Sequence, residues 1–252
     1  MKIAILGFGQ EGKAVLKFLK KNRPQVKPVI LDKKRDPKYL SKIKNFDVIY
    51  RSPGVPYNLP QIQSAIKNGV KFSSATNLFF QYAKGTIIGI TGTKGKSTTS
   101  TLLYRVLKNA GRDVYLGGNI GKPAIELLPK LKKNSITILE LSSFQLQDLR
   151  HSPGIAIILD VFPDHLDAHR DLKEYLAAKG NIIKNQKRSD LVFYFSGNKQ
   201  SRNIALKSKG KKIAVAADKD IPGLKIPGGH NRKNAAMVMA VANELKVPQK
   251  KV

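Results

Sequence analysis

A glycine-rich segment, residues 90–98, carries the clearest chemistry in the chain. Its sequence is Ile-Thr-Gly-Thr-Lys-Gly-Lys-Ser-Thr, and it lies between an apolar run, 86–90, and a helical apolar pattern. A strand, a glycine turn and a helix N-terminus together direct backbone N–H groups at a phosphate. Lys96 would place positive charge on the β- and γ-phosphates of a nucleotide, and the Ser97 hydroxyl would bind the accompanying Mg²⁺. The strict pattern has glycine where this chain has Ile90, so the segment predicts a variant phosphate loop.

A second glycine turn occupies residues 7–12, Gly-Phe-Gly-Gln-Glu-Gly, after a short apolar run, 2–6. Asp32 lies twenty residues beyond Gly12, which is the spacing of a dinucleotide-binding fingerprint. The same turn would hold any diphosphate, because the glycines only allow the backbone to approach and its N–H groups to point outward. From these residues alone, NAD and a nucleotide sugar remain alternatives.

Acidic and imidazole side chains follow two apolar strands. Glu140 ends the run 136–139, and Asp-His-Leu-Asp-Ala-His, residues 164–169, follows the run 155–159. Because the carboxyl ends of parallel strands face the ligand crevice, a carboxylate there could hold Mg²⁺, and the histidines could bind metal or transfer protons. The alternatives are a solvated glutamate and a polar loop in which Asp167 caps a helix.

Three other residues have two interpretations each. Lys179 lies on a predicted helix, where its chemistry alone indicates an ordinary surface lysine. Asn231 and Asn234 stand near the start of the last helical pattern, 234–245, where each could cap the helix or hydrogen-bond a purine edge.

Composition narrows the class of protein. Forty-six Lys and Arg against 17 Asp and Glu give a net charge of +29, but the lysines are scattered, and runs such as 207–212 resemble solvated turns. We therefore expect a lysine-rich surface with no dedicated nucleic-acid role. The absence of cysteine excludes disulfides and thiolate metal sites. No apolar run is long enough to span a membrane, and no signal peptide is evident, so the expected location is the cytoplasm.

The order of elements predicts an α/β protein with mainly parallel, doubly wound sheets, because apolar strands alternate with helical patterns. Two units are expected, 1–84 and 85–252. The expected strands are 2–6, 26–31, 47–50 and 70–72 in the first unit, and 86–90, 113–116, 136–139, 155–159 and 191–195 in the second.

Taken together, the motifs resemble the Mur ligases, and they do so in order along the whole chain. The matching segments are residues 7–12, 52–54, 91–98, 119–123, 140–146, 164–169, 177–179 and 229–236. The segment 140–146, Glu-Leu-Ser-Ser-Phe-Gln-Leu, favours the branch that adds D-glutamate to UDP-N-acetylmuramoyl-L-alanine. The resemblance implies a Rossmann-like UDP-sugar-binding domain, 1–84, and a P-loop-type central ATP-binding domain, 85–252.

The resemblance also implies a role for each matching residue. UDP-sugar contacts would come from Gly9, Gln10, Glu11, Gly12, Asp32, Ser52, Pro53 and Gly54, with Asn119, Ser142 and Gln145 at the muramoyl-alanine end. ATP contacts would come from Gly92, Thr93, Lys94, Gly95, Lys96, Ser97, Thr98, Asn231 and Asn234. Two Mg²⁺ sites would use Ser97, Glu140, His165 and a carbamylated Lys179, since CO₂ turns a repelling ammonium into an anion. Lys96, His165 and Lys179 would be the catalytic residues.

The implied reaction transfers phosphate from ATP to the substrate carboxylate, after which the amine of D-glutamate attacks the acyl phosphate. Lys94 and Asp160 stand where the family usually has asparagine. The chain stops at Val252, before the family's third domain, so we expect a monomeric two-domain form that binds UDP-sugar and weakly ATP, with little ligation. The alternatives are a non-catalytic nucleotide-binding module, half of a split ligase, an NAD-dependent oxidoreductase and a nucleic-acid binder.

Overall fold

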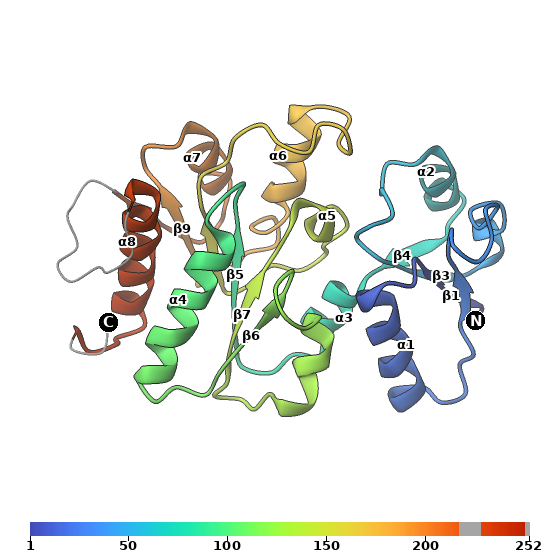
Figure 1. The fold of residues 1–252 in the computed structure, drawn as a ribbon, viewed down its shortest axis with the longest axis horizontal. Helices are drawn as coiled ribbons and strands as arrows, with labels where there is room; N and C mark the ends of the chain where they lie inside the picture. The colour runs from blue at the N-terminus through green and yellow to red at the C-terminus, as the bar shows by residue number, and fades with distance from the viewer. Residues whose placement is uncertain (217–227, 250–252) are drawn as a thin grey trace.

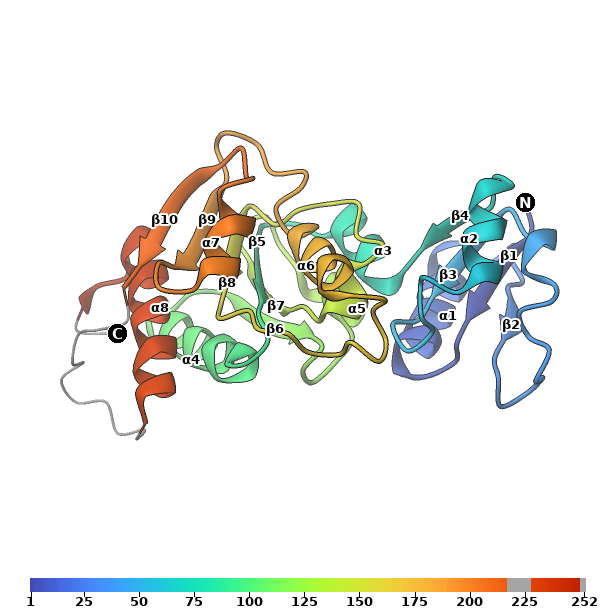
Figure 2. The ribbon, with the colours of Figure 1, turned by 90° about the horizontal axis from the view of Figure 1, so that it is seen from above.

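The computed structural model describes residues 1–216 and 228–249. Within that part, the chain forms two all-parallel sheets that lie side by side along the long axis of the molecule, with helix α3 (Ala75–Tyr82) between them (Figures 1 and 2). Residues 217–227 and 250–252, which the expected second domain includes, lie outside the described residues. The predicted α/β class is confirmed.

The first sheet has the strand order β2-β1-β3-β4. Its strands are β1 (Ile3–Leu6), β2 (Val29–Leu31), β3 (Val48–Arg51) and β4 (Lys71–Ser73). Alternate residues of β1 join different cores: Ile3 and Ile5 pack with helix α1 (Gln10–Asn22), and Ala4 and Leu6 with helix α2 (Pro60–Lys67). Because successive strand side chains point to opposite faces, both faces of this sheet are covered by helices.

The second sheet has the order β10-β9-β8-β5-β7-β6. Its strands are β5 (Thr86–Thr91), β6 (Val114–Gly118), β7 (Ile136–Glu140), β8 (Ile155–Ile158), β9 (Leu191–Phe195) and β10 (Lys211–Val215). One face packs on α4 (Lys96–Asn109) and α8 (Gly229–Glu244). The other packs on α5 (Ser143–Leu146), α6 (Leu172–Gly180) and α7 (Lys199–Ala205). Strand β5 is central, so the loop that follows it opens at the middle of the sheet edge.

Helix α3 joins the two halves physically. Its Ala75 and Leu78 pack in the core of the first sheet, whereas Phe79 packs in the core of the second. The 3₁₀ segment η2 (Ala124–Lys130) follows β6, and its Ile125 also reaches the first core. A further 3₁₀ turn, η1, is Ile43–Asn45. The division at residues 84 and 85 stays a prediction.

Several local expectations differ from the structure. Strand β2 begins at Val29 rather than at residue 26, and α8 begins at Gly229 rather than at residue 234. Lys211 and Lys212 belong to β10 and not to a turn. Within the described part of the chain that strand pairs only with β9, so the lysine side chains of this edge strand stay exposed without loss of pairing. The sequence analysis did not predict α3, α5, α7 or β10. None of the described helices is both long and apolar enough to cross a membrane.

Candidate nucleotide-binding and substrate-binding sites

The loop between β5 and α4 has the geometry of a phosphate cradle. Gly95 adopts a left-handed conformation (φ +82°) immediately before α4, and a Cβ there would lie 2.5 Å from Oδ1 of Asn234. Only glycine fits that position. Lys96 folds back on its own loop, where Nζ donates to the carbonyls of Gly92 at 3.1 Å and Thr93 at 3.0 Å. The loop thus holds a cation at the N-terminus of a helix, where an anion is favoured.

Lys179 is buried, which corrects the surface position that its chemistry alone indicated. Only 2% of the residue is exposed, and Nζ donates to the carbonyl of Gly92 at 2.8 Å. Burial first, and the charge of Lys96 second, lower the pKa of Lys179 to about 7. A large fraction of this amine is therefore uncharged, and so nucleophilic, near neutral pH.

Glu140 ends β7, beside β5, and has one carboxylate oxygen to spare. Nδ2 of Asn119 donates to its Oε1 at 2.8 Å, whereas its buried Oε2 has no hydrogen-bond partner among the described residues. A buried, unpartnered carboxylate oxygen fits a cation ligand. No group of three or more His, Cys, Asp or Glu side chains that could hold a metal occurs among the described residues. A Mg²⁺ ion held at Glu140 would therefore need ligands of other kinds, such as the Ser97 hydroxyl or a modified Lys179.

The two histidines of the loop before α6 have different environments. His165 is half exposed, has a positive φ of 53°, and lies 3.6 Å from the carboxylate of Asp164 through Nε2. His169 is buried, with Nε2 3.0 Å from the hydroxyl of Ser143, and burial lowers its pKa. Both rings contact Phe144, at 5.2 and 5.3 Å between centroids. His165 alone of the two is therefore accessible to a ligand.

Residues from five segments meet in one pocket of about 250 Å³ above these groups. Its lining residues are Gly92, Thr93, Lys96, Asn119, Ser142, Ser143, Phe144, Asp164, His165, Tyr175 and Lys179. Glu140 adjoins it through Asn119, and Asn234 is buried against Gly95. The predicted catalytic residues Lys96, His165 and Lys179 are thus brought together, while Lys94 and Ser97 lie exposed on the phosphate loop and the first turn of α4.

Three helix-capping expectations are settled by the structure. Asp171, not Asp167, caps α6, because its carboxylate accepts from the backbone N–H of Glu174 at 2.7 Å. Helix α8 begins after Gly228 without any side-chain cap, so neither Asn231 nor Asn234 caps it. Both asparagines sit inside that helix because it starts five residues earlier than its apolar pattern indicates.

The glycine turn of the first domain lines a larger pocket of about 760 Å³. A Cβ at Gly12 would lie 2.2 Å from the carbonyl oxygen of Gly7, so α1 can begin this close to β1 only with glycine there. The hydroxyl of Ser52 also donates to that carbonyl, at 2.7 Å. The pocket is lined by Gly7, Phe8, Gly9, Gln10, Glu11, Asp32, Lys33, Lys34, Tyr39, Ser52, Pro53, Gly54 and Val55.

Asp32 is already engaged by the backbone. Its two carboxylate oxygens accept from the N–H groups of Phe8 at 2.6 Å and Lys34 at 2.9 Å. These bonds, the one from Phe8 first, lower the pKa of Asp32. The carboxylate therefore shapes the turn, which is a structural role that the sequence spacing did not reveal.

Gln145 lies between the two domains and is buried. Its Nε2 donates to Oε1 of Glu11 at 2.6 Å, and its Oε1 accepts from the backbone N–H of Ser142 at 3.0 Å as part of a capping box on α5. Burial raises the pKa of Glu11. Both side chains, expected at the sugar substrate, are thus used in a contact between the domains.

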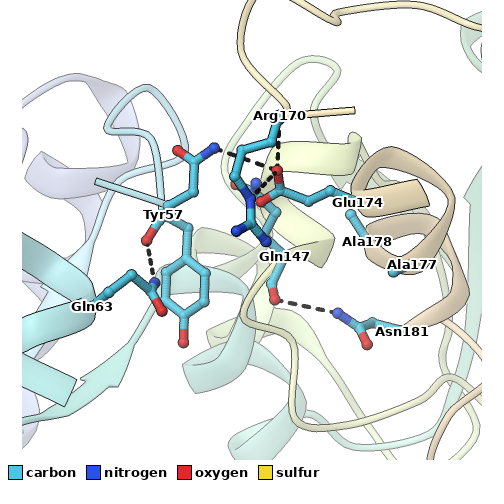
Figure 3. A pocket seen from close by; sticks show the side chains of 9 residues that line it. Tyr57, Gln63, Gln147, Arg170, Glu174, Ala177, Ala178 and Asn181 are labelled. Atoms are coloured by element: carbon cyan, nitrogen blue, oxygen red, sulfur yellow. Dashed lines mark hydrogen bonds and ion pairs between the residues drawn. The ribbon is translucent and has the colours of Figure 1, made fainter. Parts of the chain in front are cut away.

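A third pocket, of about 280 Å³, lies between the domains and was not found from the sequence (Figure 3). Tyr57, Asn58 and Gln63 come from the first domain, and Gln147, Arg170, Glu174, Ala177, Ala178 and Asn181 from the second. Nδ2 of Asn58 lies 3.4 Å from Oε2 of Glu174 and also from the carbonyl oxygen of Ala168. Scattered polar residues of this kind carry no spacing signal, so only the fold brings them together.

The two departures from the family pattern have different settings. Lys94 is exposed on the phosphate loop. Asp160 pairs with Lys233 of α8, at 3.3 Å between Oδ2 and Nζ, and its carbonyl accepts from the N–H of Thr93 at 2.8 Å. The charge of Asp160 is therefore balanced by a partner from α8.

Comparison with known proteins agrees with this architecture. Residues 90–221 match the model of the Mur ligase middle domain. The chain belongs to the Mur ligase family. It is similar to the UDP-N-acetylmuramoylalanine–D-glutamate ligases of Acetivibrio thermocellus (39% identity, 68% of this chain and 37% of the relative) and Clostridium tetani (34%, 83% and 50%). The chain thus spans half or less of the length of the curated relatives it matches.

Solved structures share the fold at low sequence identity. The UDP-N-acetylmuramate:L-alanyl-gamma-D-glutamyl-meso-diaminopimelate ligase of Neisseria meningitides has a TM-score of 0.62 at 17% identity, over 98% of this chain and 94% of that one. MurF of Thermotoga maritima, in complex with ADP, has a TM-score of 0.58 at 18% identity, over 99% and 62%. Both likenesses support the two-sheet Mur ligase architecture.

Proposed function

We propose that this chain supplies the UDP-sugar-binding and ATP-binding parts of a ligase that adds D-glutamate to UDP-N-acetylmuramoyl-L-alanine in peptidoglycan precursor synthesis. The observation that carries the proposal is the shared pocket of Lys96, His165 and Lys179, next to the unpartnered oxygen of Glu140. The D-glutamate branch is supported by curated relatives at 32–39% identity.

The proposed reaction has two steps. A carboxylate oxygen of UDP-N-acetylmuramoyl-L-alanine attacks the γ-phosphorus of ATP, the bond to the β-phosphate oxygen breaks, and ADP leaves. The amine of D-glutamate then attacks the acyl carbon, inorganic phosphate leaves, and the amine nitrogen loses a proton. Such phosphoryl transfer depends on positioning and charge neutralisation rather than on a protein nucleophile.

Each residue has a defined part in that scheme. Lys96 and the backbone N–H groups at the start of α4 bind the β- and γ-phosphates. Asn231 and Asn234, both on α8, would contact the adenine base, and Asn234 lies buried behind the loop. Glu140, Ser97, His165 and a carbamylated Lys179 would hold Mg²⁺, which neutralises charge on the transferring phosphate when bound.

The lowered pKa of Lys179 supports its carbamylation. The unprotonated Nζ attacks the carbon of CO₂, an N–C bond forms, a proton leaves to solvent, and the product carries a carboxylate-like negative charge. An amine with a pKa of about 7 is uncharged often enough at neutral pH for this step, whereas an ordinary lysine is not. The product would place a negative charge in the pocket that Lys179 shares with Lys96 and His165.

Equilibrium binding tests the proposal. We expect the purified chain to bind UDP-N-acetylmuramoyl-L-alanine more tightly than UDP-N-acetylmuramate, and to bind ATP in a Mg²⁺-dependent manner. Glu140→Gln should abolish the Mg²⁺ dependence and keep the UDP-sugar affinity, whereas Glu126→Gln, at an exposed position on η2, should change neither. Binding of NAD with no response to either UDP-sugar would overturn the proposal in favour of an oxidoreductase.

A further inference from the structure

Arg51 is a buried charge at the junction of the two domains. It ends β3, directly before the Ser52-Pro53-Gly54 loop of the UDP-sugar pocket, and its side chain is fully buried. Arginine is seldom buried this completely unless its donors are satisfied. No motif in the sequence singled this residue out.

The guanidinium holds both domains at once. Its Nε lies 3.1 Å from Oδ2 of Asp148 in the second domain. Its Nη1 donates to the carbonyl of Val55, at 2.7 Å, in the loop that lines the UDP-sugar pocket. Its Nη2 donates to the carbonyl of Phe144, at 2.8 Å, in helix α5. Because the guanidinium is planar and its donors form a rigid fork, these bonds fix the distance between the Val55 loop and α5.

The contact continues from Phe144 into the catalytic pocket. The Phe144 ring packs against the rings of His165 and His169, and the neighbouring Ser143 hydroxyl lies 3.0 Å from His169. Phe144 itself lines that pocket. Arg51 therefore connects the loop that would bind UDP with the backbone that carries the ring against His165.

We propose that Arg51 is a positioning residue that sets the separation between the UDP pocket and the catalytic pocket, and so sets the affinity for a ligand that reaches both. The inference rests on the proposed function, because it requires a substrate with a uridine diphosphate at one end and an acyl group at the other. When two subsites are held at the right separation, the second contact adds to the first without a new entropy cost. The affinity of a ligand that occupies only the UDP pocket does not depend on that separation.

The test compares two ligands on one variant. Arg51→Lys keeps the charge but cannot reach Val55, Phe144 and Asp148 together, since an ammonium lacks the fork. We expect Arg51→Lys to weaken UDP-N-acetylmuramoyl-L-alanine about tenfold while UDP affinity changes less than about twofold. Calorimetric titration with each ligand measures both values, and the thermal midpoint checks folding.

A matched variant separates the carbonyl contacts from the ion pair. Asp148→Asn keeps an acceptor oxygen for Nε and leaves the bonds to Val55 and Phe144 in place. The affinity for UDP-N-acetylmuramoyl-L-alanine, the ligand that spans both pockets, should therefore change less than about threefold. If Arg51→Lys fails to fold, the double variant Arg51→Gln with Asp148→Asn removes both charges together and should show the same selective loss.

Three results would overturn the inference. One is an equal weakening of UDP and the spanning ligand, which indicates a general structural role. Another is unchanged affinity for both in Arg51→Lys. The third is an equal loss in Arg51→Lys and Asp148→Asn, which assigns the effect to the ion pair alone. A wild-type chain that binds neither ligand refutes the proposed function, and that outcome is visible before any variant is made.

Discussion

At the scale of single residues, the decisive feature is an amine that the fold removes from water. Nζ of Lys179 donates to the carbonyl of Gly92 and lies 4.6 Å from the centroid of the Tyr175 ring. The positive charge of Lys96 also repels the ammonium form. In this buried position the uncharged amine has a lower free energy than the ammonium relative to water. We therefore expect an apolar side chain at this position to make the protein more stable.

The pH dependence of unfolding tests this directly. The pKa of Lys179 falls from 10.5 in the unfolded chain to about 7 in the folded protein, so between these values the unfolded chain binds an extra proton. The free energy of unfolding therefore rises with pH across that window. At pH 7, Lys179→Met should be more stable than wild type by on the order of 4 kcal/mol, and the difference should fall to about 1 kcal/mol or less at pH 10.

Denaturant titrations in CO₂-free buffer at several pH values measure that difference. Lys173→Met serves as the control, because Lys173 is exposed on the same helix and its substitution should give no pH-dependent difference. A constant offset between wild type and Lys179→Met at all pH values would contradict the lowered pKa.

At the scale of elements, helix starts place the functional side chains. Helix α6 carries Lys179 in its last turn and begins at the Asp171 cap. Helix α1 begins at the first glycine turn, where Gly12 lies against the Gly7 carbonyl. A substitution at the start of either helix should therefore alter protein stability or ligand binding at the site next to that helix.

Removing the α6 cap should cost a defined amount. Asp171→Ala leaves the N–H of Glu174 without its partner and should lower the free energy of unfolding by about 1 kcal/mol. Asp167→Ala, in the exposed loop just before, should change it by less than about 0.5 kcal/mol. Urea denaturation of the two variants measures both, and equal losses would show that the assignment of the cap is wrong.

The glycine turn gives a second matched pair. A methyl group at Gly12 would overlap the Gly7 carbonyl, so Gly12→Ala should destabilise the protein by about 3 kcal/mol or prevent folding. At Gly9 the same methyl would meet no atom of residues 1–216 or 228–249 within 4 Å, and φ is −74°, so Gly9→Ala should fold normally.

Because Gly9 lines the pocket that we propose binds the UDP-sugar, Gly9→Ala should nevertheless weaken UDP binding. Thermal unfolding and UDP titration of both variants check the pair. Normal folding of Gly12→Ala would contradict the close approach, and unchanged UDP affinity in Gly9→Ala would place the diphosphate elsewhere.

At the scale of the whole molecule, the net charge of +29 opposes compactness. Like charges repel one another across the surface, and added salt weakens that repulsion because it shortens the distance over which exposed charges interact. Raising NaCl from about 20 to about 200 mM at pH 7 should therefore raise the thermal midpoint by about 3–5 °C.

Differential scanning calorimetry measures that shift. Near pH 10, close to the pI of about 10.2, the repulsion disappears and the salt effect should shrink. A midpoint that falls with salt at pH 7 would show that attractive ion pairs, rather than repulsion, dominate the surface.

The sequence by itself determined the local geometry of the two glycine turns, residues 7–12 and 90–98, and the fold class. Glycine turns, apolar strands and helix patterns are set by residues a few positions apart, so the strands β1, β5, β7 and β9 lie where the pattern placed them to within a residue. The order of motifs was also enough to identify the family. Edge and connecting elements such as α3 and β10 were missed, because their patterns are short and their stability comes from packing against other segments.

Only the tertiary structure decided which side chains are buried and what they contact. Lys179 is a surface lysine by its type, and it is buried because α6 packs beneath the phosphate loop 87 residues earlier in the chain. Arg51 and Asp148, 97 residues apart, pair because α5 and the turn after it pack against the end of β3. Burial and charge pairing depend on which distant segments pack together, and the spacing of residues along the chain does not predict those long-range contacts.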